Sequence, residues 1–333
     1  MKKLFSILLT FILTIALFGC DEKISTAPLE FYAPDGAPAL SIAKFINDKE
    51  NFGMGNDVAV HYNVVSASDI GPTMMKGKGD MMVIPVNAAS KLYKANANDP
   101  YVMTAVLTHG NLYIASTEEI TLAGLKGKVI GVIGQGLVPD LTLRAILKDN
   151  GLLDDVVEGD SATDGKITIR YFAQAPDMLP LLKQGKITIG LLPEPALTNL
   201  TTKVAPDKTW SILDVQELYD DVNKAYPQAV LMVKKSVYNE FKAKIDAMGN
   251  YFAENLTWVK ANTEDAVNAI NSVLPSGVEP SLKAPILSNA VIDNCKIYYQ
   301  SSKDAKQQVI DYINKIIAVN PDSAKAVLDD FFA

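Results

Sequence analysis

A strand–loop–helix unit occurs twice in the sequence at a nearly constant spacing. Expected strands at 29–33 and 129–133 are each followed by a glycine-containing loop, a proline and a helix. The loop glycines, Gly36 and Gly136, are 100 residues apart, and the prolines that follow them are 101 residues apart. Glycine permits a tight turn, and proline is tolerated in the first turn of a helix. Each unit is therefore typical of the strand-to-helix turn of an α/β protein.

A second unit repeats in the same order. A helix ends at a glycine, a short apolar strand follows, and a proline begins the next loop, with Gly79 and Pro85 in the first copy and Gly185 and Pro193 in the second. Short apolar strands alternate with amphipathic segments, as in proteins with mainly parallel sheets. Two matching pairs of units favour an internal repeat over chance. They predict an α/β fold of two doubly wound lobes.

The chain is expected to cross between these lobes twice. Apolar strands at 112–116 and 229–233 fall at the two crossings and would form a two-strand hinge, after which mainly helical segments run to the C-terminus. We therefore expect lobe 1 to comprise 29–111 and 229–333, and lobe 2 to comprise 112–228. Two sequential domains with a helical appendage are the alternative.

The N-terminus has the three parts of a secretory signal. Two lysines are followed by an apolar run at 4–18 and by Gly19-Cys20, which correspond to the charged, apolar and cleavage regions of such signals. A run of about 15 apolar residues is shorter than the ~20 that a membrane-spanning helix needs. We therefore expect 1–19 to be removed as a signal peptide, and 20–28 to form a lipidated tether.

The end of this signal resembles the lipobox of bacterial lipoproteins, in which the cysteine is acylated and becomes the first residue. The resemblance implies lipidation of Cys20 and anchoring at the outer, extracellular or periplasmic, face of the cell membrane. More than one acyl chain would hold the protein there stably. An ordinary signal peptide with an incidental cysteine is the alternative.

Composition argues against several classes of function. The 333 residues include 38 acidic and 31 basic side chains, for a net charge of −7, and no basic stripe is present to neutralise phosphates, so we expect no nucleic-acid partner. His61 and His109 are the only histidines, so few side chains are available as zinc ligands or as the base of a catalytic triad. We expect no catalytic residue, metal or cofactor. With Cys20 acylated, Cys295 has no disulfide partner, and no apolar stripe predicts an oligomer, so we expect a monomer.

The loops of the repeated units are the candidate binding site. In doubly wound sheets, ligands bind beyond the carboxyl ends of the strands, where glycines allow close approach and helix N-termini favour anions. Each loop has a plain alternative as a tight turn, and Asn87 and Glu194 have one as helix caps. The residues expected at the cleft are Gly36, Ala37, Pro38, Asn87, His109, Asn111, Gln135, Gly136, Glu194 and Gln228.

Two segments carry a resemblance to a known family. The sequence LKGKVIGVIGQGLVPD at 125–140 and the sequence LLPEPA at 191–196 resemble the aliphatic-sulfonate, nitrate and thiamine-precursor group of ABC substrate-binding proteins. The similarity runs from about residue 29 to residue 259. It implies a type II periplasmic-binding fold, with two hinged lobes that close on a small molecule and dock onto an ABC transporter permease.

The resemblance implies the role of the protein more firmly than its ligand. Families in this group handle sulfonates, nitrate, bicarbonate, pyrimidines and riboflavin-like molecules, so a small organic or oxyanion nutrient is expected. The chain has only two arginines, Arg144 and Arg170, and neither lies in the candidate loops, so a neutral or zwitterionic heteroaromatic ligand competes with a sulfonate. Two alternatives stay open: an enzyme of pyrimidine-synthase or dehydratase type on the same fold, and a lipoprotein that senses a ligand for a signalling partner.

Overall fold

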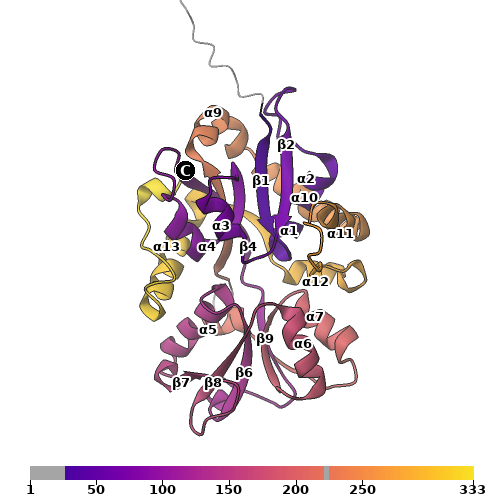
Figure 1. The fold of residues 1–333 in the computed structure, drawn as a ribbon, viewed down its shortest axis with the longest axis vertical. Coiled ribbons are helices and arrows are strands. Elements are labelled where there is room, and N and C mark those ends of the chain that lie inside the picture. Colours follow the sequence, from indigo (N-terminus) through magenta and orange to yellow (C-terminus); the bar gives the residue numbers. More distant parts are fainter. Residues whose placement is uncertain (1–26, 221–224) are drawn as a thin grey trace, which may run out of the picture.

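The computed structural model describes residues 27–220 and 225–333. The predicted signal peptide at 1–19 and the predicted lipidation site, Cys20, lie outside the described residues. Within the described part of the chain, no helix is long and apolar enough to span a membrane. Figure 1 shows two lobes, one above the other, with the chain passing from the upper lobe to the lower one and back.

The upper lobe contains a six-stranded sheet in the order β12-β4-β11-β3-β1-β2. β1 pairs in parallel with β2 and β3, whereas β11 pairs antiparallel with β3 and β4. β11 is apolar throughout 229–233 because successive side chains point to opposite faces of the sheet and both faces are buried. The strands of this sheet are β1 (Leu29–Pro34), β2 (Val60–Val65), β3 (Met81–Pro85), β4 (Tyr101–His109), β11 (Pro227–Lys234) and β12 (Ile297–Ser301).

The lower lobe contains a second six-stranded sheet in the order β10-β5-β9-β6-β8-β7. β6 pairs in parallel with β8 and β9, and β5 pairs antiparallel with β9. The order β8-β6-β9-β5 thus repeats the order β2-β1-β3-β11, and the prediction of two doubly wound α/β lobes is confirmed. The strands are β5 (Leu112–Ser116), β6 (Lys128–Ile133), β7 (Val156–Glu158), β8 (Ile167–Phe172), β9 (Ile189–Pro193) and β10 (Ser211–Asp214).

Helices cover both faces of the upper sheet, as Figure 1 shows. α1, α2, α10 and α11 pack on one face, and α3, α4 and α13 pack on the other. The helix expected after the first repeated loop is two short ones, α1 and α2, because Ile42 between them has non-helical backbone angles. The helices are α1 (Ala37–Leu40), α2 (Ala43–Asp48), α3 (Ile70–Met75), α4 (Val86–Leu92), α9 (Lys235–Asp246), α10 (Gly249–Ala261), α11 (Thr263–Ser272), α12 (Asn289–Asn294) and α13 (Ser302–Val319).

The lower sheet is covered in the same way. α5 packs on one face, and α6 and α7 pack on the other. α8 follows β10 and contacts α5. The helices are α5 (Val138–Asp149), α6 (Ala175–Gln184), α7 (Ala196–Asn199) and α8 (Val215–Tyr219).

The predicted helical tail also contains a strand, β12, which the sequence did not indicate. β12 extends the upper sheet by pairing with β4, and a register shift separates the pairs made by Ile297 and Gln300. Five residues are too few for hydrophobic periodicity to distinguish a strand from a helix. The pairing partner of this segment, β4, is also distant in sequence. This strand matters because it lies beside the point where β4 leaves the upper lobe.

α13 connects the upper lobe to the lower one. The hydroxyls of Tyr312 in α13 and Thr142 in α5 form a buried hydrogen bond of 2.6 Å. Near the other end of α5, Lys315 forms an ion pair of 2.8 Å with Asp149. One buried apolar cluster includes residues of both sheets and of these two helices. The lobes therefore share a core on the α13 side in addition to their two chain crossings.

The two chain crossings also contact each other. The backbone N–H of Gly110, between β4 and β5, donates to the carbonyl of Tyr226, just before β11 (2.9 Å). Gln216 in α8 both accepts from and donates to the backbone of Leu112, at 2.9 and 3.0 Å. A side chain on Gly110 would meet the ring of Tyr226, because a Cβ there would lie 2.3 Å from the nearest ring atom. The crossing therefore requires glycine at this position.

We expect Gly110→Ala to lower the free energy of unfolding by about 1–3 kcal/mol, the usual cost of overpacking a buried site. The measurement is urea unfolding of the variant and of the unmodified protein. Gly71→Ala is the matched control, since the nearest atom to a Cβ at Gly71 lies 3.6 Å away, and this change should be neutral or stabilising. Equal stability of the Gly110→Ala variant and the unmodified protein would contradict the packing described at the crossing.

Candidate functional site

The candidate residues of the upper lobe lie where three neighbouring strands meet the lower lobe. Pro85 at the end of β3 pairs with Ala229 of β11, and Pro227 at the start of β11 pairs with His109 at the end of β4. Asn87 follows β3, Gln228 lies between the two paired positions of β11, and Asn111 follows β4. Adjacent strand ends therefore bring these side chains to one edge of the sheet.

The two asparagines use their amide nitrogens and leave their oxygens without partners. Asn87 Nδ2 donates to the carbonyl of Ser323, and Asn111 Nδ2 donates to the carbonyl of Glu194, both at 3.2 Å. The Oδ1 atom of each is buried and has no hydrogen-bond partner. Because a carbonyl can only accept, these contacts fix which end of each amide is free.

His109 is held as a neutral imidazole. Its Nε2 lies 3.2 Å from Gln300 Oε1, and an amide oxygen requires a donor, so Nε2 carries the proton. Burial lowers the pKa of His109 to about 4, and the contacts with Gln300 and with the backbone of Lys296 only partly oppose this. The ring stacks on Tyr298 at 3.7 Å, with 4° between the planes. Nδ1 is buried without a partner.

Gln228 completes a set of four side chains that we name the junction group: Asn87, His109, Asn111 and Gln228. Gln228 is half-buried where the β4–β11 register shifts, and its Oε1 is a buried atom without a partner. An unpaired buried polar atom costs about 1–3 kcal/mol, and most such atoms in proteins are paired. Four of them at neighbouring strand ends are typical of a site that receives hydrogen bonds from a bound molecule.

Glu194 lies at the start of α7, on the lower side of the junction. Its carboxylate accepts from the backbone N–H and the hydroxyl of Thr198, at 3.1 and 2.9 Å, which fits the helix-capping alternative. Burial raises the pKa of Glu194, and the two contacts with Thr198 partly offset that effect. Its backbone N–H donates to the carbonyl of Asn111 (3.0 Å). Glu194 thus connects the lower lobe to the junction group through its backbone.

The first repeated loop, with Gly36, Ala37 and Pro38, is tied to the C-terminal half of the chain. Gly36 has a φ of 102°, which favours glycine. The carboxylate of Asp35 accepts from the backbone N–H groups of Gly36 and Ser281, both at 2.8 Å. These contacts hold the loop in place, and the backbone N–H of Gly36 already has a hydrogen-bond partner.

The second repeated loop is divided between the junction and the surface. The backbone N–H of Gly136 donates to Asp140 in α5 (2.9 Å), and Ser323 Oγ lies 3.6 Å from the position of a Cβ on Gly136. Gln135 is exposed and donates to Glu158 of β7 (3.0 Å). The structure therefore places Gly136 beside the Ser323 segment that contacts Asn87, and it does not bring Gln135 to the junction group.

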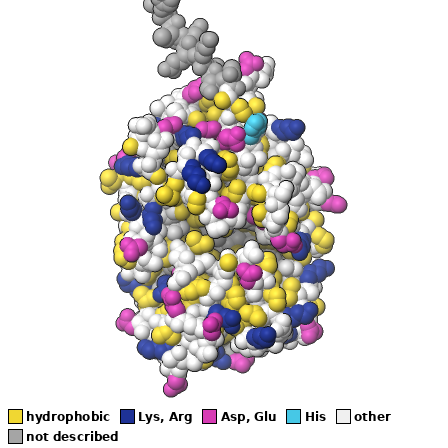
Figure 2. Space-filling model, viewed as in Figure 1, with side chains coloured by type: hydrophobic (Ala, Val, Ile, Leu, Met, Phe, Trp, Pro, Cys, Tyr) yellow, Lys and Arg dark blue, Asp and Glu magenta, His cyan; other side chains and the backbone are white. Residues whose placement is uncertain are grey.

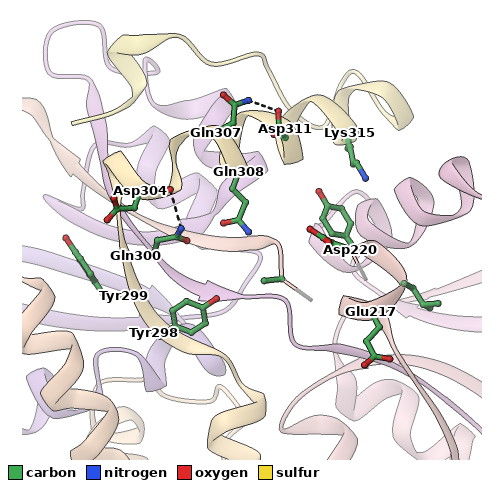
Figure 3. Close-up of a pocket in the computed structure, with 13 residues that line it drawn as sticks. Glu217, Asp220, Tyr298, Tyr299, Gln300, Asp304, Gln307, Gln308, Asp311 and Lys315 are labelled. Atoms are coloured by element: carbon green, nitrogen blue, oxygen red, sulfur yellow. Dashed lines mark hydrogen bonds between the residues drawn. The ribbon is translucent and has the colours of Figure 1, made fainter. Parts of the chain in front are cut away.

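A cavity of about 1020 Å³ lies beside the junction group, between α8, β12 and α13 (Figure 3). Tyr298 and Gln300, which both contact His109, form part of its wall. Figure 2 shows that the surface is also hollowed between the upper and lower lobes. In the described ranges, no group of three or more His, Cys, Asp or Glu side chains could hold a metal ion.

Several residues that contact the candidate loops or the junction group were not predicted from the sequence. Most of them come from the C-terminal segments, which were interpreted as a helical tail without a role in the site. No local motif marks them, because a serine or a tyrosine becomes informative only when its distant neighbour is known. The additional residues are Thr198, Ser281, Tyr298, Gln300 and Ser323.

The arrangement of two doubly wound lobes with a two-strand hinge and C-terminal helices is a type II periplasmic-binding fold. No protein-family model and no curated protein sequence matches the chain, so the likeness lies in the structure.

Similar solved structures cover nearly the whole chain. An ABC transporter protein from Parabacteroides distasonis has a TM-score of 0.70 and 18% identity, over 92% of this chain and 98% of that one. The periplasmic aliphatic sulphonate-binding protein SsuA from Escherichia coli has a TM-score of 0.61 and 14% identity, over 91% and 95%. The alkanesulfonate-binding protein SsuA from Xanthomonas axonopodis pv. citri, bound to MOPS, has a TM-score of 0.58 and 14% identity, over 91% and 96%. At these identities the likeness concerns the fold.

We expect His109 to make the protein less stable in acid. In the unfolded chain an imidazole titrates near pH 6.5, whereas burial lowers the pKa of His109 to about 4. Between these values the unfolded state binds a proton that the folded state does not, so the free energy of unfolding falls as the pH is lowered from 6.5 towards 4, by up to about 3 kcal/mol.

The measurement is urea unfolding of the unmodified protein and of the His109→Gln variant between pH 4.5 and 7. The variant should lose less stability on acidification, and the contribution of Glu194 cancels because both proteins contain it. Parallel slopes for the His109→Gln variant and the unmodified protein would contradict a buried neutral imidazole.

Proposed function

We propose that the protein is an extracytoplasmic, lipid-anchored receptor that binds a small molecule between its lobes and delivers it to the permease of an ABC importer. The observation that carries the proposal is the junction group. Its four side chains present unpaired buried polar atoms at the meeting point of the lobes, and a bound ligand would satisfy them.

The proposed mechanism is closure of the lobes around the ligand. Asn87 follows β3 of the upper sheet and Glu194 follows β9 of the lower one, whereas Asn111 and Gln228 lie at the two chain crossings, next to the proposed lobe boundaries. A molecule that contacts both lobes favours the closed arrangement only through contacts that the open one lacks. We propose lobe boundaries of 29–111 with 229–333, and 112–228, so that both crossings serve as the hinge.

The fold supports this role over catalysis. Two of the similar structures are named as sulfonate-binding proteins and a third as an ABC transporter, and the alignments include both lobes. The proposed role requires capture and release of the ligand, without chemistry on it. The signal-like N-terminus and Cys20 support export and lipid anchoring, which would keep the receptor close to its permease.

The test is mass spectrometry of small molecules released from the purified protein, followed by thermal unfolding with each candidate added. A true ligand at 100 times its dissociation constant should stabilise the protein by about 2.7 kcal/mol and raise Tm by a few degrees. Bovine serum albumin that is added to an equivalent lysate and purified by the same steps controls for carried-over metabolites. If no molecule is released, and none from a broad nutrient panel raises Tm, the receptor function is contradicted.

A further inference from the structure

We infer that the ligand is a neutral or cationic molecule that donates several hydrogen bonds, and that an anion such as a sulfonate does not fit this site. The inference rests on the proposed function and specifies the class of molecule that the junction group binds. It follows from which atoms are free and from which charges are already paired.

The free atoms of the junction group are acceptors. The contacts of Asn87 and Asn111 give each amide nitrogen a carbonyl partner, whereas the oxygen of each amide has no partner. The proton on Nε2 of His109 leaves Nδ1 as a lone-pair acceptor in the neutral ring, and Gln228 adds a fourth acceptor, Oε1. Acceptors are satisfied by N–H or O–H groups. A sulfonate, which has only acceptor oxygens, could satisfy none of these four atoms.

The helix end that could have received an anion is already occupied. α5 is the one long helix that begins in a candidate loop of the described chain, and its first-turn residue Asp140 accepts from the backbone N–H of Gly136 (2.9 Å). Asp140 is 2% exposed, and it also binds Arg144 and Tyr171. An anion at this end would have to displace a buried carboxylate.

The cationic side chains near the site are also engaged. Arg144 forms ion pairs with Asp140 and Glu158, at 2.8 and 2.9 Å. Among the described residues that line the cavity of Figure 3, Lys315 is the single basic one, against four carboxylates, and it pairs with Asp149 (2.8 Å). The local charge therefore favours a cation or a neutral donor over an anion.

Tyr298 adds a surface for a flat molecule. One face of its ring stacks on His109, yet the side chain is still 42% exposed and lines the cavity. An exposed aromatic ring beside hydrogen-bond acceptors suits a planar ligand that stacks and donates at its edge.

The test uses three fragments that share a benzene ring and differ in the attached group: benzamidine, benzamide and benzenesulfonate. Thermal unfolding and calorimetric titration of the purified protein should show binding of benzamidine or benzamide and none of benzenesulfonate. Binding of benzenesulfonate overturns the inference, and so does a lack of binding by both benzamidine and benzamide.

Substitution of Gln228 tests the acceptor role directly. Gln228→Met keeps the length of the side chain and removes the acceptor, so the affinity for the bound fragment should fall about tenfold. Gln228→Glu keeps an acceptor oxygen and should preserve or strengthen benzamidine binding. Without ligand, Gln228→Met should melt at the same temperature as the unmodified protein or higher, because it removes an unpaired buried oxygen. Unchanged affinity in Gln228→Met overturns the assignment.

The class of molecule released from the purified protein separates the two claims. A released anion that stabilises the protein would leave the receptor function intact and overturn the donor-ligand inference. A released neutral or cationic donor supports both. If nothing is released and no fragment binds, both fail.

Discussion

The rest of the structure depends on the contact between the two chain crossings. Gly110 and Tyr226 bring the end of β4 and the start of β11 together by a backbone hydrogen bond, and the absence of a side chain on Gly110 gives room for the tyrosine ring. This contact sets how the upper sheet ends, and it therefore fixes where His109, Asn111 and Gln228 lie. The same two strands are the only backbone paths between the lobes in the described chain, so the candidate site and the hinge coincide.

This coincidence explains why polar groups are left unpaired in an otherwise well-packed protein. The cores on both sides of the junction are apolar and continuous, and burial of acceptors beside them is costly unless a partner arrives. A ligand that supplies the missing donors would recover that cost in the closed state only. In the proposed mechanism, unpaired acceptors at the hinge couple binding to closure, while α13 keeps the two lobes in contact on one side.

Much of the fold follows from local sequence. The repeated loops of Gly36 and Gly136 and the apolar strands between them predict two lobes, because turn and strand preferences act over a few residues. β12 and the contacts of Ser281 and Ser323 could not be predicted in this way, since they depend on pairing across most of the chain. The candidate site shows the same division: Asn87 and Gln228 lie at predicted strand ends and meet at the junction, whereas Gln135 turns to the surface to reach Glu158.

Pulsed electron–electron double resonance between spin labels on the two lobes tests most directly the claim that the lobes close around the junction group. Met75→Cys on α3 and Lys183→Cys on α6 place labels at exposed positions of opposite lobes, and Cys295 is buried and should stay unlabelled. The account predicts a shorter and narrower distance distribution when the released molecule, or a fragment that stabilises the protein, is added. An identical distribution with and without a saturating ligand would contradict closure of the lobes around the junction group.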